Sequence, residues 1–252
     1  METLPKSYMR VVRKLTGYWG TYLPSRELAP GMIGSVLDGI FVKEGHLSQF
    51  PGFDPLAHSV QEESESDPVS LWNTRHVSMN VFGVNASLTT GGETAGLRMQ
   101  FGGANEAAII CNGTIYRSFA NLRAVKELML QLLEHKKWDR DQCIITEVLY
   151  AKKAWICFST GKDQTAELHA SVALVPGMDA LGMFKGAGGQ VNLIAASTNA
   201  LAAGYSTTLP NGGTPLFRAL KFQRDLPNPF HLTPGYLKGC ETAFEEPVFG
   251  EE

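Results

Sequence analysis

The chain has 252 residues, with 22 basic and 25 acidic side chains and a formal net charge of −3. This length allows one large or two small domains with a real core, and the slightly acidic balance argues against a nucleic-acid partner. The first apolar residues alternate with basic ones, so no signal peptide is predicted. Cys111, Cys143, Cys157 and Cys240 show no CxxC spacing, and the middle two lie in apolar strand patterns, as reduced packing residues do. We therefore expect a cytoplasmic protein.

Residues 4 to 15 have the pattern of an amphipathic helix that ends at Gly17. The apolar side of this helix is formed by Leu4, Tyr8, Val11, Val12 and Leu15. Much of the remaining surface is basic, and the cations expected to meet acidic lipid headgroups are Lys6, Arg10, Arg13 and Lys14. The alternative interpretation is a solvated helix that covers the edge of a sheet.

The segment from 18 to 70 is expected to contain a short strand, a second helix, a turn and a surface loop. A short strand is predicted over 18–23. Pro30 begins a predicted second helix with apolar residues at Ile33, Val36, Leu37 and Ile40. Residues 41–45 are expected to form the next turn. Residues 51–70 combine three prolines with an acidic cluster and no periodicity, which is typical of a surface loop.

The first of two weakly charged hairpins spans about 77–110. Its arms alternate apolar and polar residues, and the phase switches at Gly83, where we expect a bulge or kink. Residues 89–92 have the composition of a turn, and the return arm ends at Gly102-Gly103. The apolar residues of this pattern are Val77, Met79, Val81, Leu97, Met99 and Phe101.

Between the hairpins the sequence predicts a helix followed by two core strands. The helix runs from about 121 to 138, with Ser118 or Asn121 as its N-cap. Its buried stripe is expected to consist of Leu122, Val125, Met129, Leu132 and Leu133. Apolar strands are predicted over 143–150 and 154–158, with the polar pair Lys152-Lys153 as an interruption between them.

The second hairpin spans about 160–205 and is nearly free of charge. From Ala187 to Phe217 there are 31 residues without Asp, Glu, Lys or Arg. This run is too polar and glycine-rich for a membrane helix, so it would enter lipid only as strands of roughly 9–11 residues. The candidate lipid-facing residues are Leu168, Val172, Leu174, Val191 and Leu193. An ordinary hairpin that stays in water is the alternative.

A last strand is predicted over 215–223, and the composition changes after it. Residues 224–252 hold two basic and six acidic side chains, a net charge of −4, together with several aromatic residues. This mixture is too apolar for a purely solvated tail, so we expect the segment to lie against the body. The predicted organisation is a domain over 1–223 and a short acidic segment over 224–252.

Catalytic and metal-binding signatures are missing from the sequence. There is no complete GxGxxG, no Walker A lysine, no GxSxG and no HExxH. The six histidines are scattered without metal-ligand spacing. We therefore expect neither an enzyme nor a bound metal or cofactor.

Several segments together resemble the pore-forming domain of the gasdermin family. The matching segments, in the family's order, are Met9–Leu15, Tyr22–Pro24, Ser78–Phe82, Ile144–Leu149 and Gly213–Arg218. Their order and spacing over residues 8 to 223 carry the resemblance. It implies an α+β fold, a twisted antiparallel β-sheet with peripheral α-helices. It also implies that the two hairpins refold into a transmembrane β-barrel made by many copies.

The resemblance further implies a short microbial member that acts as a cell-death effector. Bacterial members are typically palmitoylated near the N-terminus, and this chain has no cysteine before Cys111, which favours the fungal members that act in allorecognition. The implied partners are acidic phospholipids, further copies or a divergent variant, and an activating protease. Location would change from the cytoplasm to the plasma membrane on activation.

Two activation routes are open. In one, a protease removes an inhibitory acidic C-terminal segment. In the other, a partner variant triggers assembly. The alternative function is that of a soluble β-rich binding or scaffold protein that never enters a membrane.

Overall fold

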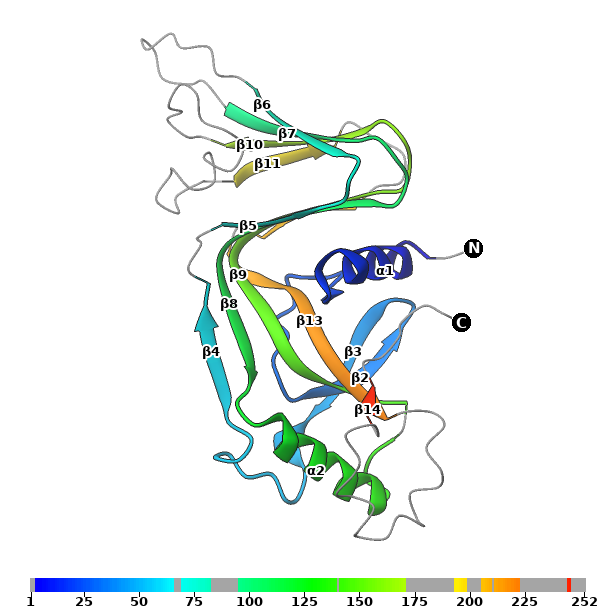
Figure 1. Ribbon diagram of the computed structural model, residues 1–252, viewed down its shortest axis with the longest axis vertical. Coiled ribbons are helices and arrows are strands. Elements are labelled where there is room, and N and C mark those ends of the chain that lie inside the picture. The colour runs from blue at the N-terminus through cyan, green and yellow to red at the C-terminus, as the bar shows by residue number, and fades with distance from the viewer. Residues whose placement is uncertain are drawn as a thin grey trace.

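The computed structural model describes residues 3–65, 69–82, 95–139, 141–170, 193–198, 205–209, 211–222 and 244–245. Within these ranges the fold is α+β, with antiparallel strand pairs and two α-helices (Figure 1). The helical elements are α1 (Leu4–Thr16), the 3-10 turn η1 (Leu47–Gln49) and α2 (Leu122–Glu134). The strands are β1 (Trp19–Gly20), β2 (Met32–Leu37), β3 (Ile40–His46), β4 (Val60–Ser64), β5 (Val69–Asn73), β6 (Val77–Phe82), β7 (Ala95–Phe101), β8 (Glu106–Phe119), β9 (Cys143–Ser159), β10 (Gln164–Ala170), β11 (Leu193–Thr198), β12 (Tyr205–Leu209), β13 (Gly213–Phe222) and β14 (Phe244–Glu245).

The described strands form a large sheet of ten and a small sheet of four. In the large sheet β8 and β9 are the long central pair, with β4 and β5 along the outer side of β8, and β12 and β13 along the outer side of β9. β9 is one uninterrupted strand of 17 residues. The predicted break at Lys152-Lys153 is therefore wrong, because Lys152 is exposed and the ladder to β8 continues past both residues.

The small sheet is a continuation of the large one that folds back over it. In the upper part of the large sheet the order is β5-β8-β9-β12, and in the small sheet it is β6-β7-β10-β11. Each small-sheet strand is the chain neighbour of the large-sheet strand at the same place in the order. A four-stranded ribbon thus turns back on itself, and the described residues form three of its corners, 74–76, 102–105 and 160–163, at the top of the molecule in Figure 1.

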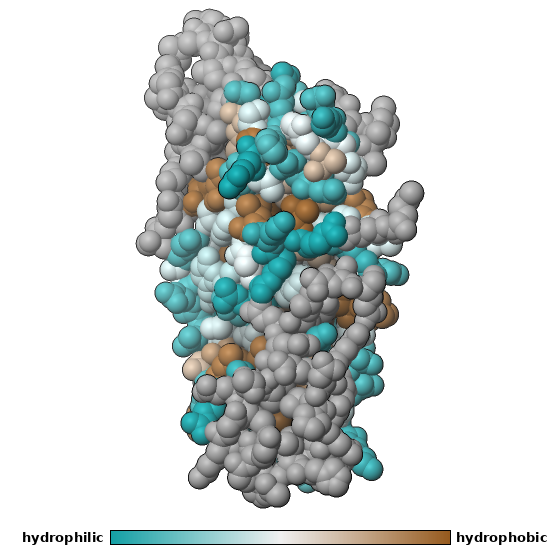
Figure 2. All heavy atoms as spheres, turned by 45° about the vertical axis from the view of Figure 1, so that its right-hand side comes forward, coloured by the Kyte–Doolittle hydropathy of each residue, from teal (hydrophilic) through white to brown (hydrophobic). Residues whose placement is uncertain are grey.

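A layer of buried apolar side chains lies where the two sheets face each other. These residues are at most 3 % exposed, yet they belong to neither of the two core clusters of the body: Leu97, Met99, Phe101, Ala108, Ile110, Trp155, Cys157 and Ala166. They alternate along their strands with residues of the opposite faces, so the two sheets cover each other. Figure 2 shows a band of hydrophobic residues between the folded-back sheet and α1.

Helix α1 confirms the predicted N-terminal helix and lies on the concave side of the large sheet (Figure 1). Tyr8 and Val12 are fully buried, and the other three residues of the predicted apolar side, Leu4, Val11 and Leu15, pack partly buried against the same core. Gly17 ends the helix with φ +78, the left-handed conformation that glycine adopts without strain.

Helix α2 confirms the second predicted helix, with Asn121 and not Ser118 as its cap: the Asn121 side chain accepts from the Ala124 amide. Four of the five predicted stripe residues are buried in the second core cluster. Leu122 is the exception at 39 % exposure, because it begins the helix next to the exposed cap. In Figure 1 α2 lies at the end of the molecule opposite the small sheet.

The predicted helix from Pro30 is wrong, and so is the turn at 41–45. Residues 32–46 form the β2–β3 hairpin, whose turn at Asp38-Gly39 has φ +51 and +80. These are type I′ values, and Asp-Gly is a preferred pair for that turn. A side chain at Gly39 would also collide with α1, because a Cβ there would lie 2.6 Å from backbone atoms of Pro5 and Lys6.

The predicted loop over 51–70 contains β4 and the start of β5, which pair with β8. All five residues of β4 are exposed, so no alternation marks this strand in the sequence. The predicted strand over 18–23 is shorter than expected, with only Trp19–Gly20 paired to β13. The last predicted strand is confirmed as β13.

Several predicted features lie outside the described residues: the phase switch at Gly83, both glycine-rich hairpin tips and most of the C-terminal segment. The exception in the C-terminal segment is β14, which pairs antiparallel with the end of β13, Phe244 opposite Phe222 and Glu245 opposite Lys221. This part of the tail therefore lies against the body, as expected.

Candidate functional site

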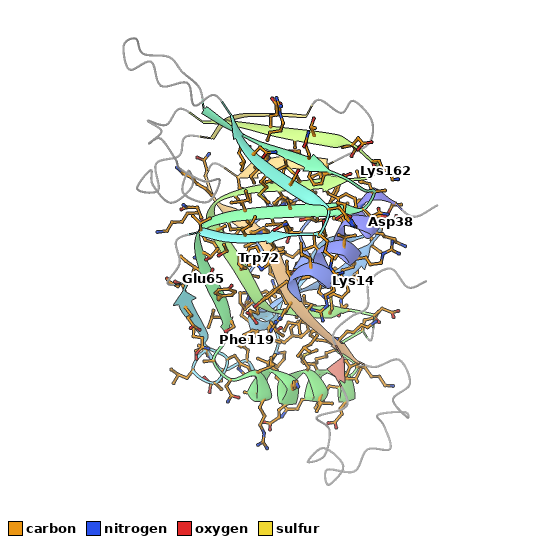
Figure 3. The ribbon with its side chains drawn as sticks, turned by 45° about the horizontal axis from the view of Figure 1, so that its top comes forward. Lys14, Asp38, Glu65, Trp72, Phe119 and Lys162 are labelled. Carbon is orange, nitrogen blue, oxygen red and sulfur yellow. The ribbon has the colours of Figure 1, made fainter. Side chains whose placement is uncertain are left out.

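Three of the four basic residues of α1, Lys6, Arg10 and Lys14, lie on its side away from the core. Arg10 and Lys14 are exposed, and Lys6 is half-buried, 3.9 Å from Asp38 of the β2–β3 turn. Figure 3 shows Lys14 and Asp38 at this side of the molecule. Arg13 instead turns toward the body: its guanidinium donates to the Gly17 carbonyl and lies 5.2 Å from the centre of the Trp19 ring. Burial and the nearby Arg218 lower the Arg13 pKa.

Tyr8 fixes α1 at the point where the ribbon approaches its corners. Its ring centroid lies 5.9 Å from Phe158, the next-to-last residue of β9, and 5.4 Å from Tyr205, the first residue of β12. The Tyr205 hydroxyl in turn donates to the Tyr22 carbonyl at 2.6 Å. Among the described residues the fully buried Tyr8 hydroxyl has no hydrogen-bond partner, and burial raises its pKa strongly. The helix with the exposed cations is therefore seated beside the fold-back.

The two predicted hairpins are confirmed as strand pairs, β6 with β7 and β10 with β11, and they also pair with each other through β7 and β10. The small sheet ends at Phe101 on one side and begins at Gln164 on the other, so the predicted first hairpin extends too far. Residues 106–110 belong to the large sheet.

The candidate lipid-facing residues Val77, Met79, Leu97, Met99 and Phe101 share one face of the small sheet. Met79, Met99 and Ala166 form one rung, and Val77 is opposite Phe101. Leu97 is opposite both Val81 and Leu168 in the register, and Leu193 is opposite Ala170. Leu97, Met99 and Phe101 are buried, while Val77 and Met79 are half-buried. Val172, Leu174 and Val191 lie outside the described residues.

The other face of the small sheet is polar. Ser78, Asn80, Arg98 and Gln100 are exposed. Arg98 donates to Glu167, its cross-strand partner, at 2.7 Å, which joins the two hairpins by an ion pair. This pair was not predicted, although Arg98 and Glu167 are the one basic and the one acidic residue of β7 and β10. The sheet is thus apolar toward the body and polar toward water.

The inner two corners keep the strand register unchanged. Glu106 is opposite Ser159 in the large sheet. Phe101, five residues before Glu106, is opposite Gln164, five residues after Ser159, in the small sheet. The corner segments are therefore of equal length, 102–105 and 160–163. Asn105 and Asp163 adopt left-handed conformations with φ +58 and +57. The outer strands do shift, because Asn73 is opposite Ala108 while Val77 is opposite Phe101.

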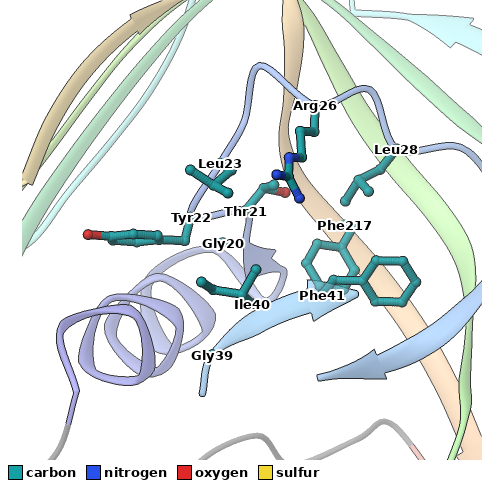
Figure 4. Close-up of a pocket in the computed structure, with 10 residues that line it drawn as sticks. All are labelled: Gly20, Thr21, Tyr22, Leu23, Arg26, Leu28, Gly39, Ile40, Phe41 and Phe217. Atoms are coloured by element: carbon teal, nitrogen blue, oxygen red, sulfur yellow. The ribbon is translucent and has the colours of Figure 1, made fainter. Parts of the chain in front are cut away.

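Neither of two hollows in the described part of the chain is suited to bind a ligand. An apolar pocket between segment 20–28 and the start of β3 has a volume of about 20 Å³, room for about one water molecule (Figure 4). A wider hollow contains Glu65 and Glu147, but Thr114 donates to Glu65 at 2.6 Å and Tyr18 donates to Glu147. These carboxylates are part of the hydrogen-bonded frame.

No three potential ligands among the described His, Cys, Asp and Glu residues come together to hold a metal ion. Neither described helix is long and apolar enough to span a membrane. Burial raises the pKa of the Cys143 and Cys157 thiols to about 12, so both stay protonated near neutral pH. Cys111 is likewise buried, and Cys240 lies outside the described residues.

Comparison of the chain with models of known families finds no match, and comparison with curated proteins finds none either.

Proposed function

We propose that this chain is a pore-forming protein of the gasdermin type. In this proposal α1 binds acidic phospholipids, and the folded-back sheet swings outward at its corners. The straightened ribbon joins those of further copies to form membrane-spanning β-strands around a pore. The protein is cytoplasmic before this step, at the plasma membrane after it, and the pore kills the cell.

The observation that carries the proposal is the unchanged register across the inner corners. Because β7 and β10 are already paired in the register of β8 and β9, straightening both corners would extend one continuous ladder. No inner strand pair has to be broken and formed again. The backbone groups of the inner strands would enter lipid already hydrogen-bonded. This avoids the cost of several kcal/mol for each unpaired backbone group in lipid.

The face pattern and length of the ribbon support the same function. With the corners straight, residues 95–105 would extend β8 by 11 residues, within the range of about 9–11 for a tilted membrane strand. Their apolar face would meet lipid, and Arg98 and Glu167 would stay paired on the polar face toward the pore.

The position of α1 supports it independently. Tyr8 holds the helix against Phe158, next to the corner through which the ribbon would descend. A basic helix at the base of a descending ribbon would lie at the height of the lipid headgroups, where each cation contributes about 1 kcal/mol of attraction to an anionic surface.

The trigger remains a choice between the two routes stated above, and β14 bears on the first of them. Because β14 pairs with β13, the tail is attached to the body at Phe244 and Glu245 in the resting state. Cleavage before β14 would free it. Under the second route, a divergent variant would supply the neighbouring ribbon.

A soluble β-rich binding or scaffold protein is the second candidate. It is favoured by the closed state itself, in which Leu97, Met99 and Phe101 are buried. The small sheet needs no membrane to cover its apolar face.

The test is dye release from anionic vesicles with two matched variants. Met79→Asp places a charge on the apolar face, and Asn80→Asp places the same charge one residue away on the polar face. Both positions lie on the outer strand β6, Met79 half-buried and Asn80 exposed, so both variants should fold.

A carboxylate on the lipid side costs a membrane strand up to about 2–4 kcal/mol near the bilayer centre. Met79→Asp should therefore slow release at least tenfold, while Asn80→Asp should release like the parent chain. The assay includes the full chain, a truncation after Asp225 and, for the second route, a variant partner. Absence of release in every arrangement rejects the pore and favours the scaffold.

A further inference from the structure

Ser159 connects two of the corners at which the ribbon turns back. It is the last residue of β9 and is 1 % exposed. Its hydroxyl oxygen lies 2.6 Å from the Gly161 carbonyl oxygen in its own corner and 3.1 Å from the Gly103 carbonyl oxygen in the corner between β7 and β8. Its one proton is donated to one carbonyl at a time or shared between them, so this single hydroxyl lies within hydrogen-bond distance of both turns.

Glu106 connects a third corner to the same place. It is the first residue of β8, directly opposite Ser159, and is 8 % exposed. Its Oε1 lies 2.9 Å from Nδ1 of His76, which belongs to the corner between β5 and β6. The His76 carbonyl in turn accepts the Gly102 amide at 2.8 Å. The three corners that the structure describes are therefore joined through the facing residues Ser159 and Glu106.

We propose that Ser159 and Glu106 form a latch that holds the ribbon folded back. This inference rests on the proposed function, because the latch sets how readily the hairpins are released. The two are positioning residues: they act on the corners and need touch neither lipid nor the neighbouring copy.

The latch lies where straightening must begin. The corner carbonyls of Gly103 and Gly161 point to one hydroxyl only in the folded-back state, since straightening carries segments 102–105 and 160–163 into extended strands. The contacts of Ser159 with the Gly103 carbonyl and of Glu106 with His76 must then be lost. These partly buried hydrogen bonds oppose opening, and removing one partner leaves a polar group unpaired in the closed state.

The experiment compares Ser159→Ala with a control that weakens the fold elsewhere. Val125→Ala removes a fully buried side chain from α2, at the opposite end of the molecule. Hydrogen exchange is measured in solution at the Gly102 and Thr160 amides, and dye release is measured on anionic vesicles. Ser159→Ala should speed exchange of both corner amides and dye release about tenfold, while exchange at α2 stays unchanged. Val125→Ala should speed exchange at α2 and leave the corners protected.

Glu106 is tested by rescue. Glu106→Ala should behave like Ser159→Ala, and Glu106→Gln, which keeps an acceptor for His76, should recover most of the protection. The latch is wrong if corner exchange in Ser159→Ala equals that of the parent chain, or if Val125→Ala opens the corners equally. If hydrogen exchange at the corners becomes faster but no variant releases dye, the latch proposal stands and the proposed pore-forming function is rejected.

Discussion

The two ends of the molecule use the same strands in different ways. At the α2 end, β9 and β13 are covered by a cluster of large apolar side chains that includes Met129, Trp138 and Phe222. At the other end, β8 and β9 turn through glycine-containing corners and are covered by their own continuation. At one end the large sheet is covered by the apolar side chains of helix α2. At the other end it is covered by the small sheet, which a few polar contacts at the corners hold in place.

This difference suggests that the α2 end stays fixed while the small sheet can be displaced. Displacing α2 would expose a stripe of buried side chains without any replacement partner. Displacing the small sheet would keep its inner strand pairing and expose only the layer between the sheets. Local opening is expected where polar contacts hold few elements together, and the corners meet that description.

The largest expected effect is the loss of folding stability caused by a cavity under helix α2. Leu132→Ala removes a side chain that is 3 % exposed and should lower the free energy of unfolding by about 2–5 kcal/mol. Leu122→Ala, in the same helix but 39 % exposed, should change it by less than about 1 kcal/mol. Urea unfolding followed by tryptophan fluorescence measures both. Equal losses would contradict the assignment of the α2 face.

A smaller effect is expected at the corners. Asn105 and Asp163 are exposed and left-handed, and valine in that conformation costs about 1–2 kcal/mol while it favours the extended state. Asn105→Val and Asp163→Val should each speed dye release about tenfold, and glycine at the same positions should slow it. The measurement is the rate of dye release by each variant and by the parent chain on the same vesicle preparation. Slower release from the valine variants would show that the corners do not straighten.

The smallest expected effect concerns the surface of α1. Lys14→Ala and Arg10→Ala should each weaken vesicle binding about fivefold, because one cation near an anionic surface is worth about 1 kcal/mol. Arg123→Ala, an exposed cation on α2, is the matched control and should bind unchanged. Vesicle co-sedimentation measures binding, and the difference should shrink as salt is raised. An equal loss at Arg123 would remove α1 as the membrane-binding element.

The sequence could predict the elements whose local pattern is decisive. Both α-helices follow from their apolar stripes, and the arms of the hairpins follow from alternation. The β2–β3 hairpin was missed because Ile33, Val36, Leu37 and Ile40 have helical spacing by coincidence, although Asp38-Gly39 is a turn signal. β4 was missed because both of its faces are exposed, so its residues carry no periodicity.

The fold-back could not be predicted, for a physical reason. A ribbon that continues straight and one that turns back have the same alternation, so the pattern of β7 and β8 fits both. Gly102-Gly103 and Gly161 mark interruptions without fixing their direction. The facing of Ser159 and Glu106 depends on pairing between distant strands, which no local motif encodes. For the candidate site, the sequence predicted the cations of α1. Their position beside the corners could not be predicted, because it depends on the contacts of Tyr8 with Phe158 and Tyr205.

The pairing of β14 with β13 has a consequence for the end of the chain. Among the described residues the pairing joins Phe244 and Glu245 to Phe222 and Lys221, and the chain between Phe222 and Phe244 makes it an intramolecular contact. An intramolecular contact forms at an effective concentration that does not fall when the protein is diluted. A single cut between Phe222 and Phe244 would turn the pairing into a bimolecular contact, which dilution would weaken.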